Sequence, residues 1–226
     1  MKKAYLEGME AVFFDFEGTL VEDQWNVKGA VQETLEKLRA CGFSTEELQG
    51  KKYSLLMREA MQVASKAGRS PEEVREMIGA IYDRYDQDAL SRWRLRPGVK
   101  EGLQTLQSRG IKTALVSNVG RKALALAFQK LDLLSSFDLV VSRNDVQTMK
   151  PSGEGIQLAL NRLHVRKEKV LFVGDSPDDV HAAREAGVRV VLIADGENPK
   201  AEAPRAQPDN LIRNLREFLV NLLGNV

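Results

Sequence analysis

The sequence predicts a doubly wound α/β core, a parallel sheet with helices on both faces, and an all-helical segment inserted after the first strand. Short apolar runs recur along the chain, and amphipathic helical patterns lie between them. The runs lack the alternation of half-exposed strands, so they predict strands that are buried on both faces. Strands that alternate with helices in this way form parallel sheets.

Five strands are expected in this Rossmann-like core. They occupy residues 11–16, 111–117, 137–142, 169–174 and 188–194. Helical patterns end before Gly110, at Leu163 and before Gly187, and a glycine directly after a helical pattern is a common helix end. A loop rich in proline and charge follows the last strand. A terminal helix is then expected, with one apolar face made of Leu211, Leu215, Phe218, Leu219 and Leu222.

Residues 21–95 interrupt this alternation, because their periodicity is helical only. Two helices are expected to end at Gly42 and Gly68, and a third follows Ser70 and Pro71, an N-cap and a first-turn proline. We therefore expect residues 1–20 and 96–226 to form the α/β core and residues 21–95 to form a helical cap. Trp25 and Trp93 flank the two connections, where they either line an entrance or pack the cap.

Composition excludes several classes of protein. The 33 Lys and Arg residues balance 32 Asp and Glu residues, so no basic field would attract nucleic acid or an anionic membrane. Cys41 is the sole cysteine, which excludes an internal disulfide and fits a reducing compartment. No apolar run approaches the length of a membrane span. We expect a cytoplasmic protein, a monomer or small homo-oligomer, that binds neither nucleic acid nor a membrane.

Polar side chains gather at the ends of the predicted strands, where open parallel sheets bind their ligands. They are Asp15 and Glu17 after the first strand, Ser117 and Asn118 after the second, Asp175 and Asp179 after the fourth, and Lys150 in a loop. Carboxylates that converge either share protons or hold a cation. Oxygen ligands without His or Cys favour a hard ion, in particular Mg²⁺.

Four motifs occur in order, with the helical insert after the first: "DFEGTL", "VSN", "KP" and "VGDSPDDV". Together they resemble the haloacid dehalogenase-like hydrolase superfamily, in its phosphatase branch with a small helical cap, the phosphoglycolate-phosphatase-like group. The resemblance covers nearly the whole chain. The stretch "GDSPDDV" after an apolar strand is specific by itself, whereas "VSN" and "KP" gain meaning only from their order.

The resemblance implies a Mg²⁺-dependent phosphatase that acts on a small phosphorylated metabolite. Asp15 would be the nucleophile and would form an aspartyl-phosphate. Asp15, Asp175 and the backbone carbonyl of Glu17 would hold the metal.

The resemblance also implies how the phosphate would be bound. Ser117, Asn118 and Lys150 would contact its oxygens, and the lysine would add positive charge in the transition state. Asp179, together with Asp178, would steady the waters of the metal or Lys150.

Glu17 departs from the family pattern, in which an aspartate two positions after the nucleophile is the acid–base residue. Glutamate has the same chemistry, but its extra methylene moves the carboxyl group relative to the leaving oxygen. The alternative is therefore a regulatory module that binds phosphate and Mg²⁺ with little or no turnover. A 2-haloacid dehalogenase is a further alternative, disfavoured because that branch lacks the acids seen here at Glu17 and Asp175.

Overall fold

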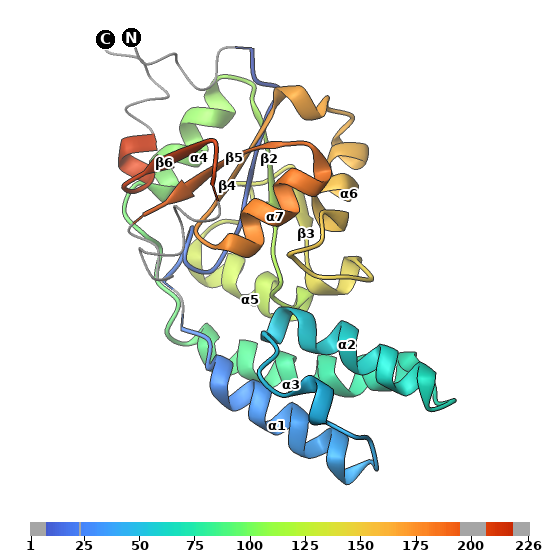
Figure 1. Ribbon diagram of the computed structural model, residues 1–226. Coiled ribbons are helices and arrows are strands. Elements are labelled where there is room, and N and C mark those ends of the chain that lie inside the picture. The colour runs from blue at the N-terminus through green and yellow to red at the C-terminus, as the bar shows by residue number, and fades with distance from the viewer. Residues whose placement is uncertain (1–7, 23, 195–206, 219–226) are drawn as a thin grey trace.

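The computed structural model describes residues 8–22, 24–194 and 207–218. In this part of the chain, an α/β core carries an all-helical unit beyond one end of its sheet (Figure 1). Within these ranges, no helix combines the length and the apolar composition that a membrane crossing requires.

Six parallel strands form the sheet, in the order β3-β2-β1-β4-β5-β6. They are β1 (Ala11–Phe14), β2 (Lys112–Val116), β3 (Leu139–Val141), β4 (Val170–Gly174), β5 (Arg189–Ile193) and β6 (Asn210–Ile212). The first five confirm the predicted strands. The chain moves from β1 to one side of the sheet and then returns to the other side through β4. The edge beyond the carboxyl ends of β1 and β4 is therefore the switch point at which such sheets bind ligands.

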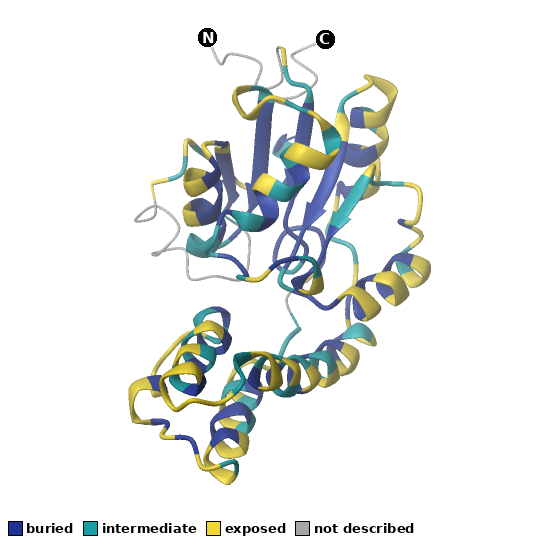
Figure 2. Cartoon of the chain, turned by 90° about the vertical axis from the view of Figure 1, so that its right-hand side faces the viewer, coloured by how far each residue is buried: buried dark blue, intermediate teal, exposed yellow. Residues whose placement is uncertain are grey.

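Helices cover both faces of the sheet, as predicted. On one face Val12 and Phe14 pack with α4 (Val99–Ser108) and α5 (Arg121–Leu131). On the opposite face, the alternate residues of β1 pack with two further helices, α6 (Glu154–Leu163) and α7 (Pro177–Ala186). Figure 2 shows the result: buried strands lie between helices whose outer sides are exposed. This double burial explains why the strands read as continuous apolar runs.

The inserted segment folds as the three predicted helices, α1 (Val27–Ala40), α2 (Tyr53–Lys66) and α3 (Pro71–Leu90). They share an apolar cluster of their own. Ser70 caps α3 by accepting the N–H of Glu73, as the sequence indicates. The two connections to the core run side by side, because Val21 forms an antiparallel bridge with Leu95.

The prediction for the C-terminal region was wrong at Leu211. This residue lies in β6, where it pairs with Leu192 of β5, and its side chain is exposed rather than part of a helix face. Only three residues form the strand, too short a run to stand out in the sequence. Leu215 and Phe218 are buried against the core, as an apolar helix face would be. Leu219, Leu222 and most of the predicted loop after β5 lie outside the described residues.

Candidate active site

Asp15 is the first residue after β1. Its backbone N–H donates to the carbonyl of Val173 at 2.9 Å, which extends the β1–β4 pairing by one residue. The chain then turns at Gly18, where φ is +77°. A Cβ at Gly18 would lie 2.2 Å from Oδ2 of Asp175. Both the left-handed backbone and the close approach therefore require glycine here.

Lys150 joins two of the predicted carboxylates. Its Nζ donates to Oδ1 of Asp15 at 2.5 Å and to Oδ1 of Asp179 at 2.7 Å. The lysine is only 6% exposed. Because a buried ammonium requires compensating negative charge, these contacts stabilise the lysine at this position. The fold therefore places the "KP" lysine beside Asp15.

Asp179 is fixed by the N-terminus of α7. Its Oδ2 accepts the hydroxyl of Ser176 at 2.7 Å and the backbone N–H groups of Ser176 and Asp175 at 3.0 and 3.2 Å. The Ser176 hydroxyl accepts the N–H of Asp179 in return, which completes a capping box. The Asp179 carboxylate therefore both completes the capping box of α7 and contacts Lys150.

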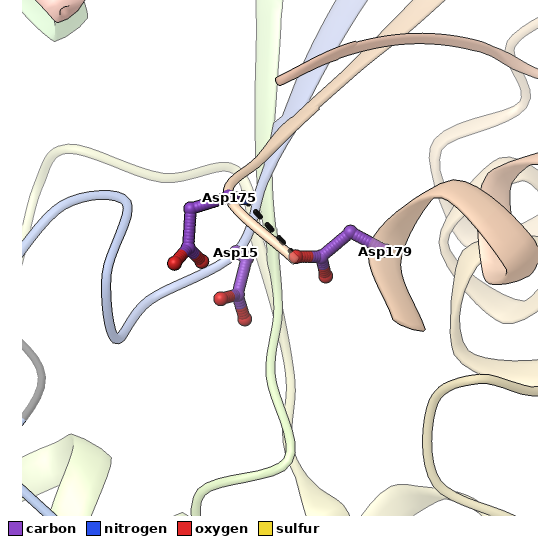
Figure 3. A group of neighbouring side chains, drawn as sticks. All are labelled: Asp15, Asp175 and Asp179. Atoms are coloured by element: carbon purple, nitrogen blue, oxygen red, sulfur yellow. Dashed lines mark hydrogen bonds between the residues drawn. The ribbon is translucent and has the colours of Figure 1, made fainter. Parts of the chain in front are cut away.

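Three carboxylates face one another at the end of the sheet (Figure 3). Asp15 follows β1, Asp175 follows β4 and Asp179 lies in α7. One carboxylate oxygen of each lies within 4.8 Å of the others. The hydroxyl of Thr19 also approaches Asp175, at 3.5 Å. An all-oxygen donor set of this kind fits a hard divalent cation, so the residues present match the expected metal.

Ser117 and Asn118 follow β2 and lie in the wall of the same cavity. The Ser117 hydroxyl accepts the N–H of Val119 at 3.2 Å. The Asn118 amide binds the backbone of Lys150 at both polar groups: Nδ2 donates to the carbonyl at 3.1 Å, and Oδ1 accepts the N–H at 3.0 Å. Asn118 therefore anchors the lysine loop to the end of β2.

Glu17 is held by an indole. Nε1 of Trp93 donates to Oε1 of Glu17 at 2.7 Å. Trp93 is completely buried and packs edge-on against Phe16, with ring centroids 5.1 Å apart. Trp93 therefore packs in the apolar cluster of the α/β core, and it belongs neither to the described lining of the cavity nor to the apolar cluster of the helical unit. Its contact with Glu17 was not foreseen, because no local pattern links the two positions.

A cavity of about 280 Å³ lies between the core and the helical unit. Its core side includes the predicted residues Asp15, Glu17 and Asp175. The other side is formed by residues at the N-termini of α1 and α2 and before α1, namely Trp25, Val27, Lys52, Tyr53 and Ser54. Sequence reasoning missed Lys52, Tyr53 and Ser54, because nothing in a helix start indicates which residue will face a distant strand end.

Asp178 lines the same cavity but makes other contacts than Asp179. Its carboxylate accepts the Ser54 hydroxyl at 2.7 Å and the Lys52 ammonium at 3.3 Å. Neighbouring residues in the first turn of a helix point in different directions, so only Asp179 faces the lysine. Asp178 instead connects the start of α7 to the start of α2.

Burial and neighbouring charges together shift the pKa values of Asp15 and Lys150. Desolvation raises the pKa of Asp15 to about 7, although the charge of Lys150 opposes the shift. Burial alone would lower the pKa of Lys150, but the Asp15 and Asp179 carboxylates raise it above its ordinary value. Additional positive charge beside Asp15 would therefore favour its ionised form.

Two further buried charges escaped the sequence reasoning: Asp86 and Arg143, which form an ion pair. A signal for Asp86 exists, because it lies four residues after Tyr82 on the buried side of α3. A carboxylate on an apolar helix face needs a buried partner. Nothing in the sequence identifies that partner as Arg143.

Comparisons with known proteins agree with this geometry. The model of the haloacid dehalogenase-like hydrolase family matches residues 12–193. Phosphoglycolate phosphatase of Shigella dysenteriae serotype 1 is 27% identical over 232 residues, which cover 94% of this chain and 92% of that protein. The same enzyme of Escherichia coli strain K12 is 28% identical with the same coverage.

Among solved structures, a hydrolase from Pseudomonas syringae shares the fold with a TM-score of 0.70 and 20% identity, over 95% of this chain and 98% of that one. The matched family range contains every predicted site residue, from Asp15 to Asp179. The chain therefore belongs to the haloacid dehalogenase-like hydrolase family, as an enzyme of its phosphatase branch.

Proposed function

We propose that this enzyme hydrolyses the phosphate ester of a small metabolite through an aspartyl-phosphate on Asp15, with Mg²⁺ in the site. The observation that carries the proposal is the contact between Asp15 and Lys150 beside Asp175, in a cavity at the switch point of the sheet. By analogy with the curated relatives, a small carboxylated ester such as phosphoglycolate is the first substrate to test.

In the first step, a carboxylate oxygen of Asp15 attacks the phosphorus and the bond to the leaving alcohol breaks. Glu17 gives its proton to the leaving oxygen. In the second step, Glu17 takes a proton from water, whose oxygen attacks the aspartyl-phosphate. Inorganic phosphate leaves and Asp15 is regenerated, so atoms and protons balance over the cycle.

Asp15, Asp175 and the carbonyl of Glu17 would hold the Mg²⁺. When bound, the ion supplies positive charge that reduces repulsion between the nucleophile and the phosphate. The Lys150 ammonium and the Ser117 hydroxyl would bind phosphoryl oxygens. We assign Asn118 to the same task through the Lys150 loop, because both polar groups of its side chain bind that backbone.

We further propose that residues 21–95 act as a cap on a core of residues 1–20 and 96–226. The paired connections at Val21 and Leu95 would be the hinge. The contacts of Asp178 with Ser54 and Lys52 support a closed position in which the helical unit covers the cavity. Closure of this kind excludes water from the aspartyl-phosphate until Glu17 directs its hydrolysis.

A second candidate is a module that binds phosphate and Mg²⁺ without turnover. It is favoured by one observation, the bond that holds Oε1 of Glu17 at Trp93. If that bond kept the carboxyl group from the leaving oxygen, an aspartyl-phosphate would form slowly or persist.

Trapping the phosphoenzyme tests both candidates. The enzyme is mixed with Mg²⁺ and p-nitrophenyl phosphate, quenched in acid and examined by intact-mass and peptide mass spectrometry, with Asp15→Asn as the control. We expect transient phosphorylation at Asp15 together with product release. A phosphoenzyme that persists without turnover would support the binding module. Product release without phosphorylation at Asp15 would overturn the proposed intermediate.

A further inference from the structure

A buried ion pair links the helical unit to the core. Asp86 of α3 is 1% exposed and Arg143, in the short helix η2 (Arg143–Asp145), is 3% exposed. Nη2 of Arg143 donates to Oδ2 of Asp86 at 2.8 Å. The same oxygen accepts the N–H of Gly120, at the start of α5, at 2.9 Å. Neither charged residue is among the described residues that line the cavity.

The guanidinium of Arg143 also reaches the loop that bears site residues. Its Nη1 donates to the backbone carbonyl of Asn118 at 2.8 Å. The Asn118 side chain holds both backbone groups of Lys150. Hydrogen bonds therefore link Asp86, in the helical unit, through Arg143 and Asn118 to the backbone of Lys150, whose ammonium contacts Asp15.

We propose that Arg143, held by Asp86, is a positioning residue that sets the place of Lys150 through Asn118. The proposal rests on the proposed function, because it assigns residues that prepare the same site for catalysis.

The energetics of buried ion pairs argue against a purely structural role for Asp86 and Arg143. Desolvation of two charges offsets much of their attraction, and apolar residues of similar volume commonly replace such pairs without loss of stability. What apolar residues cannot do is bind a carboxylate and a carbonyl together, which the planar guanidinium does here. The arrangement is therefore suited to placing Asn118 rather than to holding the fold together.

Asp83 provides a matched control. It accepts a hydrogen bond from the same Nη2 of Arg143, but its side chain is 42% exposed, so water can replace that bond. Asp83→Asn should change turnover by no more than about twofold. Asp86→Asn removes the buried partner and should lower kcat by about tenfold or more.

The decisive variant is the double substitution Asp86→Asn with Arg143→Met, which leaves no unpaired buried charge. Thermal unfolding, kcat and KM for p-nitrophenyl phosphate, and hydrogen exchange of the Lys150 amide are measured for it and for Arg143→Met alone. We expect the double variant to regain thermal stability relative to Arg143→Met, while kcat stays about ten- to a hundredfold below wild type. The Lys150 amide should exchange faster, because its acceptor on Asn118 is no longer fixed.

Arg143→Lys separates charge from geometry, because a single ammonium keeps the charge but cannot bind both acceptors in the same way. We expect it to retain stability and still lose turnover. Recovery of wild-type kcat in the double variant, or an unchanged exchange rate of the Lys150 amide, would overturn the proposal. The exchange measurement does not depend on turnover. An inactive wild type would contradict the proposed function, but the exchange rate of the Lys150 amide would still show whether Arg143 positions Lys150.

Discussion

Gly18 occupies a position that a side chain cannot share with Asp175. Gly18→Ala would place a Cβ 2.2 Å from Oδ2 of that carboxylate, on a backbone with φ of +77°. We expect Asp175 to be displaced, the Mg²⁺ concentration for half-maximal activity to rise, and kcat to fall by about tenfold or more. Steady-state kinetics over a Mg²⁺ titration measures both effects.

Gly42→Ala is the control for backbone strain, because Gly42 has φ of +81° and a Cβ there would meet none of the described residues within 4 Å. It should cost about 1–2 kcal/mol of stability and leave the Mg²⁺ dependence unchanged. Equal Mg²⁺ dependence in the two variants would show that backbone strain, and not the collision with Asp175, explains why position 18 requires glycine.

Substitution of Trp93 tests whether its indole N–H holds Glu17 in place as the proposed acid. Trp93→Phe keeps an aromatic ring against Phe16 but removes the N–H that holds Glu17. We expect kcat/KM for an alkyl phosphate to fall by about tenfold, because a misplaced acid protonates a poor leaving group less effectively. The nitrophenolate group needs little protonation, so kcat/KM for p-nitrophenyl phosphate should change much less.

Glu17→Gln removes the proton donor altogether. It therefore gives the largest difference between the two substrates that loss of the acid can produce. If Trp93→Phe lowers kcat/KM equally for the alkyl phosphate and for p-nitrophenyl phosphate, the indole contributes to packing alone and does not orient the Glu17 carboxyl group. The dependence on the leaving group therefore separates positioning from stability.

At the level of residues, the sequence predicted which polar side chains lie close together at the end of the sheet, but not which residues hold them there. The order of the motifs was sufficient to bring Asp15, Lys150 and Asp175 together, because the motifs follow neighbouring strands or the loop between them. Trp93 and Arg143 were not identifiable as partners, since each contact depends on tertiary placement that no local pattern encodes. The contacts of Asp178 with Ser54 and Lys52 were not identifiable for the same reason.

Among the elements, α7 begins with a cap that also holds Asp179. Ser176→Ala removes the hydroxyl that pairs with Asp179 in both directions. We expect a loss of about 1 kcal/mol of stability from the missing N-cap. We also expect a lower kcat, because Asp179 would hold Lys150 less firmly. Urea unfolding and steady-state kinetics measure the two effects.

Ser70→Ala is the matched change in the helical unit, since the Ser70 hydroxyl also accepts a backbone N–H in the first turn of its helix. It should lower stability by a similar amount and leave kcat unchanged. Similar kinetics for the two serine variants would mean that the α7 cap has no effect on the site beyond helix stability.

The elements were largely predictable. Burial of β1, β2, β4 and β5 on both faces produces continuous apolar runs, and several helices end at glycines that are visible in the sequence. The strand β6 was not predictable, because its three residues include an exposed leucine and follow a proline-rich stretch. Its place at the edge of the sheet depends on β5, not on its own pattern.

At the scale of the molecule, the helical unit contacts the core through several groups of residues, and two of them involve residues discussed above. Ser54 and Lys52 meet Asp178 at the cavity, and Asp86 meets Arg143 outside it. The sequence predicted the unit from the break in strand–helix alternation. Its position beyond the end of the sheet was not predictable, because it depends on side-chain contacts between separate elements.

The measurement that tests the central claim most directly is steady-state hydrolysis of p-nitrophenyl phosphate by wild type and Asp15→Asn, with Mg²⁺ and after its removal by a chelator. The account predicts hydrolysis by wild type that requires Mg²⁺ and is lost, by about a thousandfold or more, in Asp15→Asn. Hydrolysis that persists in Asp15→Asn, or that is indifferent to removal of the metal, would contradict it.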